Sequence, residues 1–176
     1  MEDCGCINRN ELRERVAARL ASKKPVMLAS LAEDLGVTEL KIAHVLPDDM
    51  VAFTDGDAFE RVWTDIAEWE KVTFIMVHQG NVIEVKGRIP TGFFAQGYYN
   101  ITGESTFGGH IKAYDVEEIC FLSMPFMGLE SHSVQFFNDG GSVMFSIYVG
   151  REKHKLIPAV SAAFFALRDK LCTRQE

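Results

Sequence analysis

Apolar residues recur at helical spacing through the first quarter of the chain. In ELRERVAARLASKK, the two leucines and the valine fall on one side of a helix, and charged residues fall on the other. Two shorter amphipathic segments follow, separated by a Gly-Val pair, and Thr38 is a suitable N-cap for the second. This pattern predicts a flexible N-terminus over residues 1–10 and a helical subdomain, similar to a helix-turn-helix, over residues 11–47.

The pattern changes after residue 47. A further amphipathic helix, with Asp57 as its N-cap, precedes a series of alternating segments that begins at Val72. Helical spacing returns in LIPAVSAAFFALRDKLC at the end of the chain. We therefore expect an α+β fold, with N-terminal helices, a large antiparallel meander over residues 48–176 and a C-terminal helix. The expected strands are VTFIMV, VIEVKG, IKAYD, EEICFLS, HSVQFFN and SVMFSIYVG.

One connection between these elements is long. The segment GRIPTGFFAQGYYNITGESTFGGH, residues 87–110, contains six glycines and five aromatic residues in 24 positions. Long loops in compact domains tend to be functional or disordered, and this aromatic content argues against disorder. Either the segment forms a wall of a flat hydrophobic pocket, or it folds back and buries its rings in the core.

Charge and hydropathy disfavour a nucleic-acid-binding protein and a membrane protein. The net charge is −7, which disfavours a general electrostatic attraction to nucleic acid or to an anionic membrane. Residues 11–50 hold six lysines and arginines against seven acidic residues, so the helix-turn-helix-like segment lacks the basic surface of a DNA reader. No apolar run is long enough for a membrane helix, and no secretory signal begins the chain. We expect a cytoplasmic protein.

The four cysteines offer no clear metal site. Cys4 and Cys6 are the only close pair, and Cys-Gly-Cys is not the spacing of a structural zinc site or of a redox motif. We expect four reduced thiols, with metal capture by the N-terminal pair as a less favoured alternative. Zinc binding by His78 and His110 is a second alternative, although no clustered set of ligands supports it.

Candidate ligand-binding residues gather near the long connection. His78 follows a predicted strand, and His110 follows the paired glycines, so both imidazoles are expected at strand ends. An imidazole, or a phenolate from Tyr98 or Tyr99, could ligate haem iron. Positive charge comes from Lys86, Arg88, Lys112 and Arg151, which would suit the two propionates of haem; lysines in ordinary surface salt bridges are the alternative.

Several motifs in order resemble those of one family. The run VWTDIAEWEKVTFIMVHQGNVIEVKGRIPTG, followed by GYYN, GGHIKA, PFMGLESHSVQFFN and GSVMFSIYVGR, is similar to the ChuX/HutX family of cytoplasmic haem-utilisation carriers. The likeness covers about residues 57–157. It implies a large antiparallel sheet, a relation to one half of the double-length HemS/ChuS proteins, and a homodimer that mimics the longer form.

The resemblance also implies haem (iron protoporphyrin IX) as the ligand. The iron-ligand candidates are His78, His110 and Tyr98, the last from the tyrosine of the Gly-Tyr-Phe-Asn motif. The further candidates for the haem pocket and the propionates are Phe93, Phe94, Tyr99, Lys86, Arg88, Lys112, Phe126, Met127 and Arg151.

The expected function is that of a carrier, which sequesters haem and delivers it to a haem-degrading enzyme. The alternative is a haem-degrading enzyme that acts with an external reductant, since haem iron itself can activate oxygen. A metal- or DNA-linked regulator is a third hypothesis, which the charge count disfavours.

Overall fold

The computed structural model describes residues 7–22, 24–103 and 105–172, and it opens with three short helices. The Asn8 side chain accepts the backbone N–H of Glu11 at 3.0 Å and caps α1 (Arg9–Leu20). A left-handed Gly36 ends α2 (Leu28–Leu35), and the predicted cap Thr38 accepts the N–H of Lys41 at the start of α3 (Glu39–Ala43). The division into a flexible N-terminus, a helical subdomain and a sheet domain stays a prediction, and residues 1–6, which include Cys4 and Cys6, lie outside the described part.

The centre of the molecule is a six-stranded antiparallel sheet, as the alternating segments predicted. Its edges are formed by the first and third strands along the chain. In spatial order the strands are β1 (Val51–Asp55), β7 (Val116–Ser123), β8 (His132–Asn138), β9 (Val143–Val149), β2 (Val72–His78) and β3 (Asn81–Gly87).

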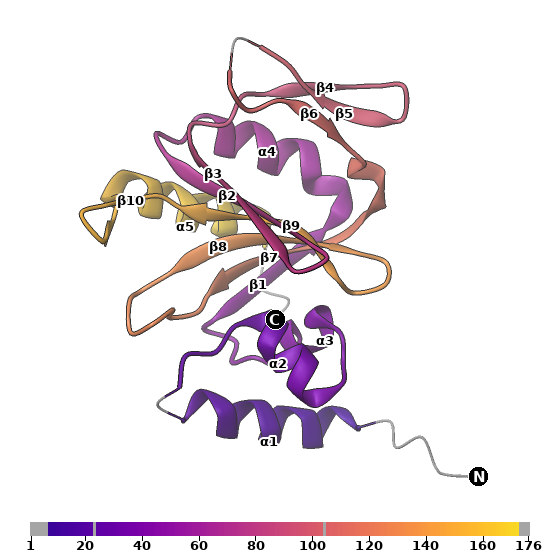
Figure 1. The fold of residues 1–176 in the computed structure, drawn as a ribbon, viewed down its shortest axis with the longest axis vertical. Helices are drawn as coiled ribbons and strands as arrows, with labels where there is room; N and C mark the ends of the chain where they lie inside the picture. Colours follow the sequence, from indigo (N-terminus) through magenta and orange to yellow (C-terminus); the bar gives the residue numbers. More distant parts are fainter. Residues whose placement is uncertain (1–6, 23, 104, 173–176) are drawn as a thin grey trace.

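Both faces of this sheet are covered by helices (Figure 1). Helices α4 (Phe59–Ala67) and α5 (Pro158–Leu171) pack on one face, where Phe121 contacts Phe164 and Phe136 contacts Phe59. Helices α1–α3 pack against the other face, where Cys120 and Leu122 are buried. Alternation along β7 thus supplies residues to two cores, because neighbouring side chains of a strand point to opposite faces.

A second, three-stranded antiparallel sheet lies over α4 and is here called the small sheet (Figure 1). It consists of β4 (Gly92–Ala95), β5 (Tyr98–Ile101) and β6 (Gly109–Ile111). The indole N–H of Trp63, on α4, donates to the carbonyl of Pro90 at 2.9 Å and ties the start of this sheet to the helix.

Several local predictions need correction. The connection 87–110 contains a small sheet rather than a single loop, because Gln96 and Gly97 form a tight turn between β4 and β5 and a longer connection leads on to β6. The strand expected at 111–115 ends at Ile111, and a 3-10 turn (Ala113–Asp115) follows. Asp57 does not cap α4; Asp55 accepts its N–H at 2.9 Å, a short 3-10 helix intervenes, and α4 begins at Phe59. The strand β1 and the hairpin of β10 (Arg151–Glu152) with β11 (Lys155–Leu156) were not predicted.

Four hairpins in the described part of the chain share one turn geometry. In each, the two residues at the tip have positive φ, as in a type I′ turn, and the residues on either side are paired across the hairpin. The tip pairs are Gln79-Gly80 (φ 49° and 78°), Gln96-Gly97 (54° and 79°), Met127-Gly128 (50° and 76°) and Lys153-His154 (48° and 67°).

Candidate functional site

The outer face of the small sheet brings together three candidate residues from three strands, Phe93, Tyr98 and His110. Asn100 on β5 lies opposite His110 on β6 and opposite Phe93 on β4. Tyr98 is two positions before Asn100, so its side chain emerges on the same face. Phe93, Tyr98, Asn100 and His110 together are called the open face below.

Asn100 fixes the orientation of the His110 ring. Its amide nitrogen donates to the carbonyl oxygens of Phe93 (3.3 Å), Ala95 (3.0 Å) and Tyr98 (3.1 Å), so its amide oxygen is turned toward His110. That oxygen lies 2.6 Å from Nδ1 of His110. An amide oxygen only accepts hydrogen bonds, so Nδ1 carries the proton and Nε2 of the neutral ring keeps its lone pair. This is the tautomer that a metal-binding imidazole needs, with its other nitrogen held by an outer partner.

Two aromatic rings share the open face with this imidazole, and one of them, Tyr98, is in contact with it. The Tyr98 ring lies 5.9 Å from the His110 ring at an interplanar angle of 61°. Tyr98 is 37% exposed and Phe93 is 53% exposed, so apolar ring surface is available to a flat ligand. The open face therefore combines a nitrogen ligand, a phenol and an aromatic surface.

Tyr99 and Phe94 lie on the opposite face of the same strands. The Tyr99 ring is fully buried against Phe59 (5.1 Å) and Trp63 (5.8 Å), and its hydroxyl accepts the backbone N–H of Gly92 at 2.9 Å. Burial raises the pKa of the Tyr99 phenol above its ordinary value. The Phe94 ring is partly buried and contacts Tyr99 at 5.1 Å. These two candidate pocket residues support the small sheet from the core side.

The remaining iron-ligand candidate, His78, is not brought to the open face. It ends β2 in the large sheet, where it pairs with Asn81, and its carbonyl accepts the Asn81 side chain at 3.2 Å. Its imidazole is exposed, and no hydrogen bond or ring contact in the described part of the chain joins it to Tyr98 or His110.

The predicted propionate cations differ in their availability. Arg88 donates to the carbonyl of Ala67 at 3.0 Å and pairs with Glu68, while Lys86 pairs with Glu84 at 3.1 Å. Lys112 is exposed two residues after His110, and among the residues that the structure describes no carboxylate pairs with it. Lys112 is therefore the cation best placed along the chain to serve the open face.

Three other candidates gather far from the open face. Met127 lies at the hairpin tip in the β7–β8 connection and Phe126 flanks it. Arg151 donates to the carbonyls of His154 and Glu130 beside this hairpin. The β7–β8 connection and the β4–β5 hairpin lie at opposite sides of the molecule in Figure 1. A role of these three residues in binding haem stays a prediction.

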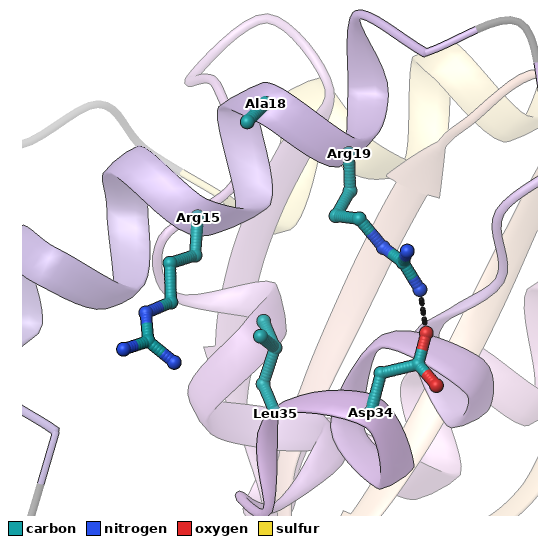
Figure 2. Close-up of a pocket in the computed structure, with 5 residues that line it drawn as sticks. All are labelled: Arg15, Ala18, Arg19, Asp34 and Leu35. Carbon is teal, nitrogen blue, oxygen red and sulfur yellow. Dashed lines mark ion pairs between the residues drawn. The ribbon is translucent and has the colours of Figure 1, made fainter.

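Two surface hollows lie away from the open face, and the second is lined in part by Glu68, the partner of Arg88. One is formed where α1 passes α2, and Arg19 pairs with Asp34 across it (Figure 2). The other lies between the end of α4 and the start of α5, beside Trp69 and Val160. Over residues 7–172, apart from positions 23 and 104, no three His, Cys, Asp or Glu side chains gather as a metal site would require. The candidate ligands His78, Tyr98 and His110 are themselves exposed, so they occupy an open surface.

Asn100 was not identified from the sequence as a functional residue. Its position in the GYYN motif, two residues after the candidate ligand Tyr98, is the signal that could have found it. Recognising its role required the pairing of β5 with β6, which places residues ten positions apart opposite each other.

Comparison with known proteins places the chain in a family. The family model described as haem utilisation ChuX/HutX matches residues 52–167. The chain belongs to the ChuX/HutX family. It is 40% identical to the intracellular heme transport protein HutX of Vibrio cholerae, over 90% of this chain and 83% of that protein. The family resemblance seen in the sequence is therefore confirmed.

Solved structures support the same fold. The heme-binding protein ChuX superposes with a TM-score of 0.82 at 32% identity, covering 91% of this chain and 98% of that one. ChuS, a heme oxygenase of E. coli, superposes with a TM-score of 0.73 at 15% identity, covering 88% of this chain and 47% of ChuS. At that identity the likeness concerns the fold alone, and it confirms that the ChuX/HutX fold corresponds to about half of the longer protein.

Proposed function

We propose that this chain is an intracellular haem carrier, which binds haem on the open face of the small sheet and passes it to a haem-degrading enzyme. Membership of the ChuX/HutX family supports haem as the ligand, and the role of the relative HutX as a heme transport protein supports transport. The observation that carries the assignment to the open face is the hydrogen bond between Asn100 and His110.

His110 is the proposed iron ligand. Its Nε2 is free to donate a lone pair to ferric iron because Asn100 occupies Nδ1. Tyr98 is the alternative ligand through its phenolate, and with His110 as ligand it supplies ring surface to the porphyrin. Phe93 extends that apolar surface, and Lys112 offers a cation to a propionate.

An open surface suits a carrier better than an oxygenase. Haem that lies on an exposed face can be taken by a recipient protein without a large conformational change. An enzyme that opens the porphyrin ring must instead control the access of oxygen and water to the iron. Haem degradation with an external reductant is the competing activity, and the products distinguish the two.

The carrier is proposed to act in the cytoplasm as a homodimer. Strand β3 is an edge of the large sheet, and the exposed Val82 (60%) lies directly opposite the exposed Val77 on β2, with Ile83 beside it. An apolar edge of this kind is a natural site for pairing with a second copy. No helix in the described ranges is long and apolar enough to cross a membrane. Light scattering that gives a monomer mass for the wild type would contradict the dimer.

A haemin titration followed at the Soret band tests the proposal. We expect the wild type to give a saturable shift, His110→Ala to lower the affinity by at least about tenfold, and Tyr98→Phe to change the spectrum. His154→Ala is the matched control, because His154 is an exposed histidine on a different hairpin. Absence of a saturable shift in the wild type, or equal effects of His110→Ala and His154→Ala, would overturn the assignment.

The fate of bound haem separates transport from degradation. With ascorbate as reductant, a carrier keeps the porphyrin intact and releases it to an acceptor such as apomyoglobin. Formation of a linear tetrapyrrole in the same reaction would show that the competing activity is the correct one.

A further inference from the structure

The hairpin tip of the β7–β8 connection differs chemically from the other three hairpins of its type. The first tip residue is Gln79, Gln96 or Lys153 in the others and Met127 here. The first tip residue of such a turn has a left-handed backbone, which favours asparagine or glycine, and its side chain is exposed to water. Met127 is 68% exposed, so it is unfavourable there both in conformation and in solvation. A residue that suits neither the backbone conformation nor the solvent exposure of its position is a candidate for a functional role.

The neighbours of Met127 extend the apolar surface. Phe126 and Leu129 exchange two backbone hydrogen bonds, of 2.9 and 3.0 Å, and both side chains are exposed. These three side chains are called the apolar tip. The surface is convex, because it consists of the end of a two-residue turn and its flanking pair.

The base of the hairpin is firmly held. His132, which is buried, lies 2.9 Å from the Ser123 hydroxyl through Nδ1 and 3.0 Å from the Glu130 carboxylate through Nε2. Its ring stacks on Phe164 of α5 at 5.3 Å. The apolar tip therefore projects from an anchored base.

A basic hairpin lies beside the apolar tip. Arg151 donates from Nη1 to the carbonyl of His154 at 3.1 Å and from Nη2 to the carbonyl of Glu130, so it clamps the β10–β11 hairpin to the base of the tip. Lys153 and Lys155 are exposed, and within the described part of the chain neither forms an ion pair. Both hairpins project from the same side of the molecule in Figure 1. Together with Arg151 these lysines outnumber the two exposed carboxylates nearby, Glu130 and Glu152, so a small net positive charge lies next to exposed apolar groups in a chain of net charge −7.

We propose that the apolar tip and the adjacent lysines dock reversibly on an anionic membrane surface. Three convex side chains are far too few for a stable protein interface, which needs about 800 Å² from each partner. A bilayer accepts convex apolar groups of any shape at its headgroup boundary, and anionic headgroups attract nearby lysines. Since the rest of the chain is acidic, only this side of the molecule faces the membrane, and docking is weak and sensitive to salt.

The test is sedimentation of the purified full-length chain with vesicles, without haem, at low ionic strength. We expect binding to vesicles that contain phosphatidylglycerol and little binding to pure phosphatidylcholine. Met127→Asn should lower binding by about fivefold or more, because it removes the apolar group at the tip. Lys153→Gln with Lys155→Gln should reduce binding and weaken its dependence on salt.

The control variant is Gln79→Asn, which places the same residue at the same position of a hairpin of the same geometry without removing an apolar group, and it should leave binding unchanged. Met127→Asn also suits the turn better than methionine, so its melting temperature should equal or exceed that of the wild type. In a second readout, Met127→Trp should shift its emission to shorter wavelength on anionic vesicles, whereas Gln79→Trp should not.

Absence of wild-type binding to anionic vesicles would overturn the proposal. So would equal binding of the wild type and Met127→Asn, or capture of an acidic soluble protein by the tip without any binding to vesicles. Membrane docking and haem carriage are separable through the two lysines, which are not haem-pocket candidates: we expect Lys153→Gln with Lys155→Gln to retain the haemin shift of the wild type.

Discussion

Both faces of the small sheet carry aromatic residues, but those on one face are exposed to a ligand and those on the other pack in the core. Tyr98 and Tyr99 are neighbours on β5, yet one is 37% exposed beside His110 and the other is fully buried against Trp63. The alternation of a strand alone causes the difference. A four-residue strand thus supplies both a candidate ligand and a core residue, so substitutions at adjacent positions should separate binding from stability.

The largest expected effect comes from the buried face. Tyr99→Ala removes a ring that packs on Phe59 and Trp63 and should lower the free energy of unfolding by about 3–5 kcal/mol. Tyr98→Ala should lower it by less than about 1 kcal/mol, because the ring is partly exposed. Urea denaturation of both variants measures the contrast. Equal losses of stability would show that the two faces are not distinct.

A smaller effect is expected from the residue that orients the imidazole. Asn100→Leu keeps the approximate volume but removes the bond to Nδ1 of His110, and it should lower haemin affinity by about tenfold. The three carbonyl oxygens that accept from the Asn100 amide can accept hydrogen bonds from water instead, because this surface is exposed. The loss of stability should therefore be modest. Haemin affinity equal to that of the wild type would show that Asn100 does not support the ligand.

The smallest effect concerns the proton of the buried phenol. The pKa of Tyr99 is raised in the folded state, so above its ordinary value of 10.0 the unfolded chain loses this proton while the folded chain retains it. Stability from Tyr99 is complete below that pH and is lost as the pH rises from it through the raised pKa of the folded state. At neutral pH, Tyr99→Phe should lower the free energy of unfolding by about 1 kcal/mol, because it removes the hydrogen bond from Gly92. The stability of this variant should also fall less steeply than that of the wild type as the pH becomes alkaline. Thermal melts at several pH values check both expectations.

The sequence allowed prediction of the elements whose pattern is long. The helices α4 and α5 and the strands of the large sheet other than β1 were predicted because each repeats its period several times. Strand β1 was missed because it has five residues and pairs with β7, more than 60 positions away. The strands β4–β6 were missed because three or four residues, with glycines among them, do not establish a period.

The site was predictable in its residue types but not in its geometry. His110 and Tyr98 were candidates because of their motifs, and the structure brings their rings together. From the residues alone Tyr99 was an equal candidate, since nothing local reveals which of two adjacent tyrosines faces outward, and only the family resemblance favoured Tyr98. The pairing of Lys86 with Glu84 and of Arg88 with Glu68 likewise depends on side-chain packing, which composition does not encode.

The position of Trp63 gives the molecule an optical reporter. Its indole lies beneath the small sheet, bonded to Pro90 and in contact with the ring of Tyr99, whose strand neighbours form the open face. Haem absorbs light at the wavelengths at which indole emits. A haem bound above the small sheet would therefore quench this tryptophan, and the degree of quenching would measure how close the cargo lies to α4.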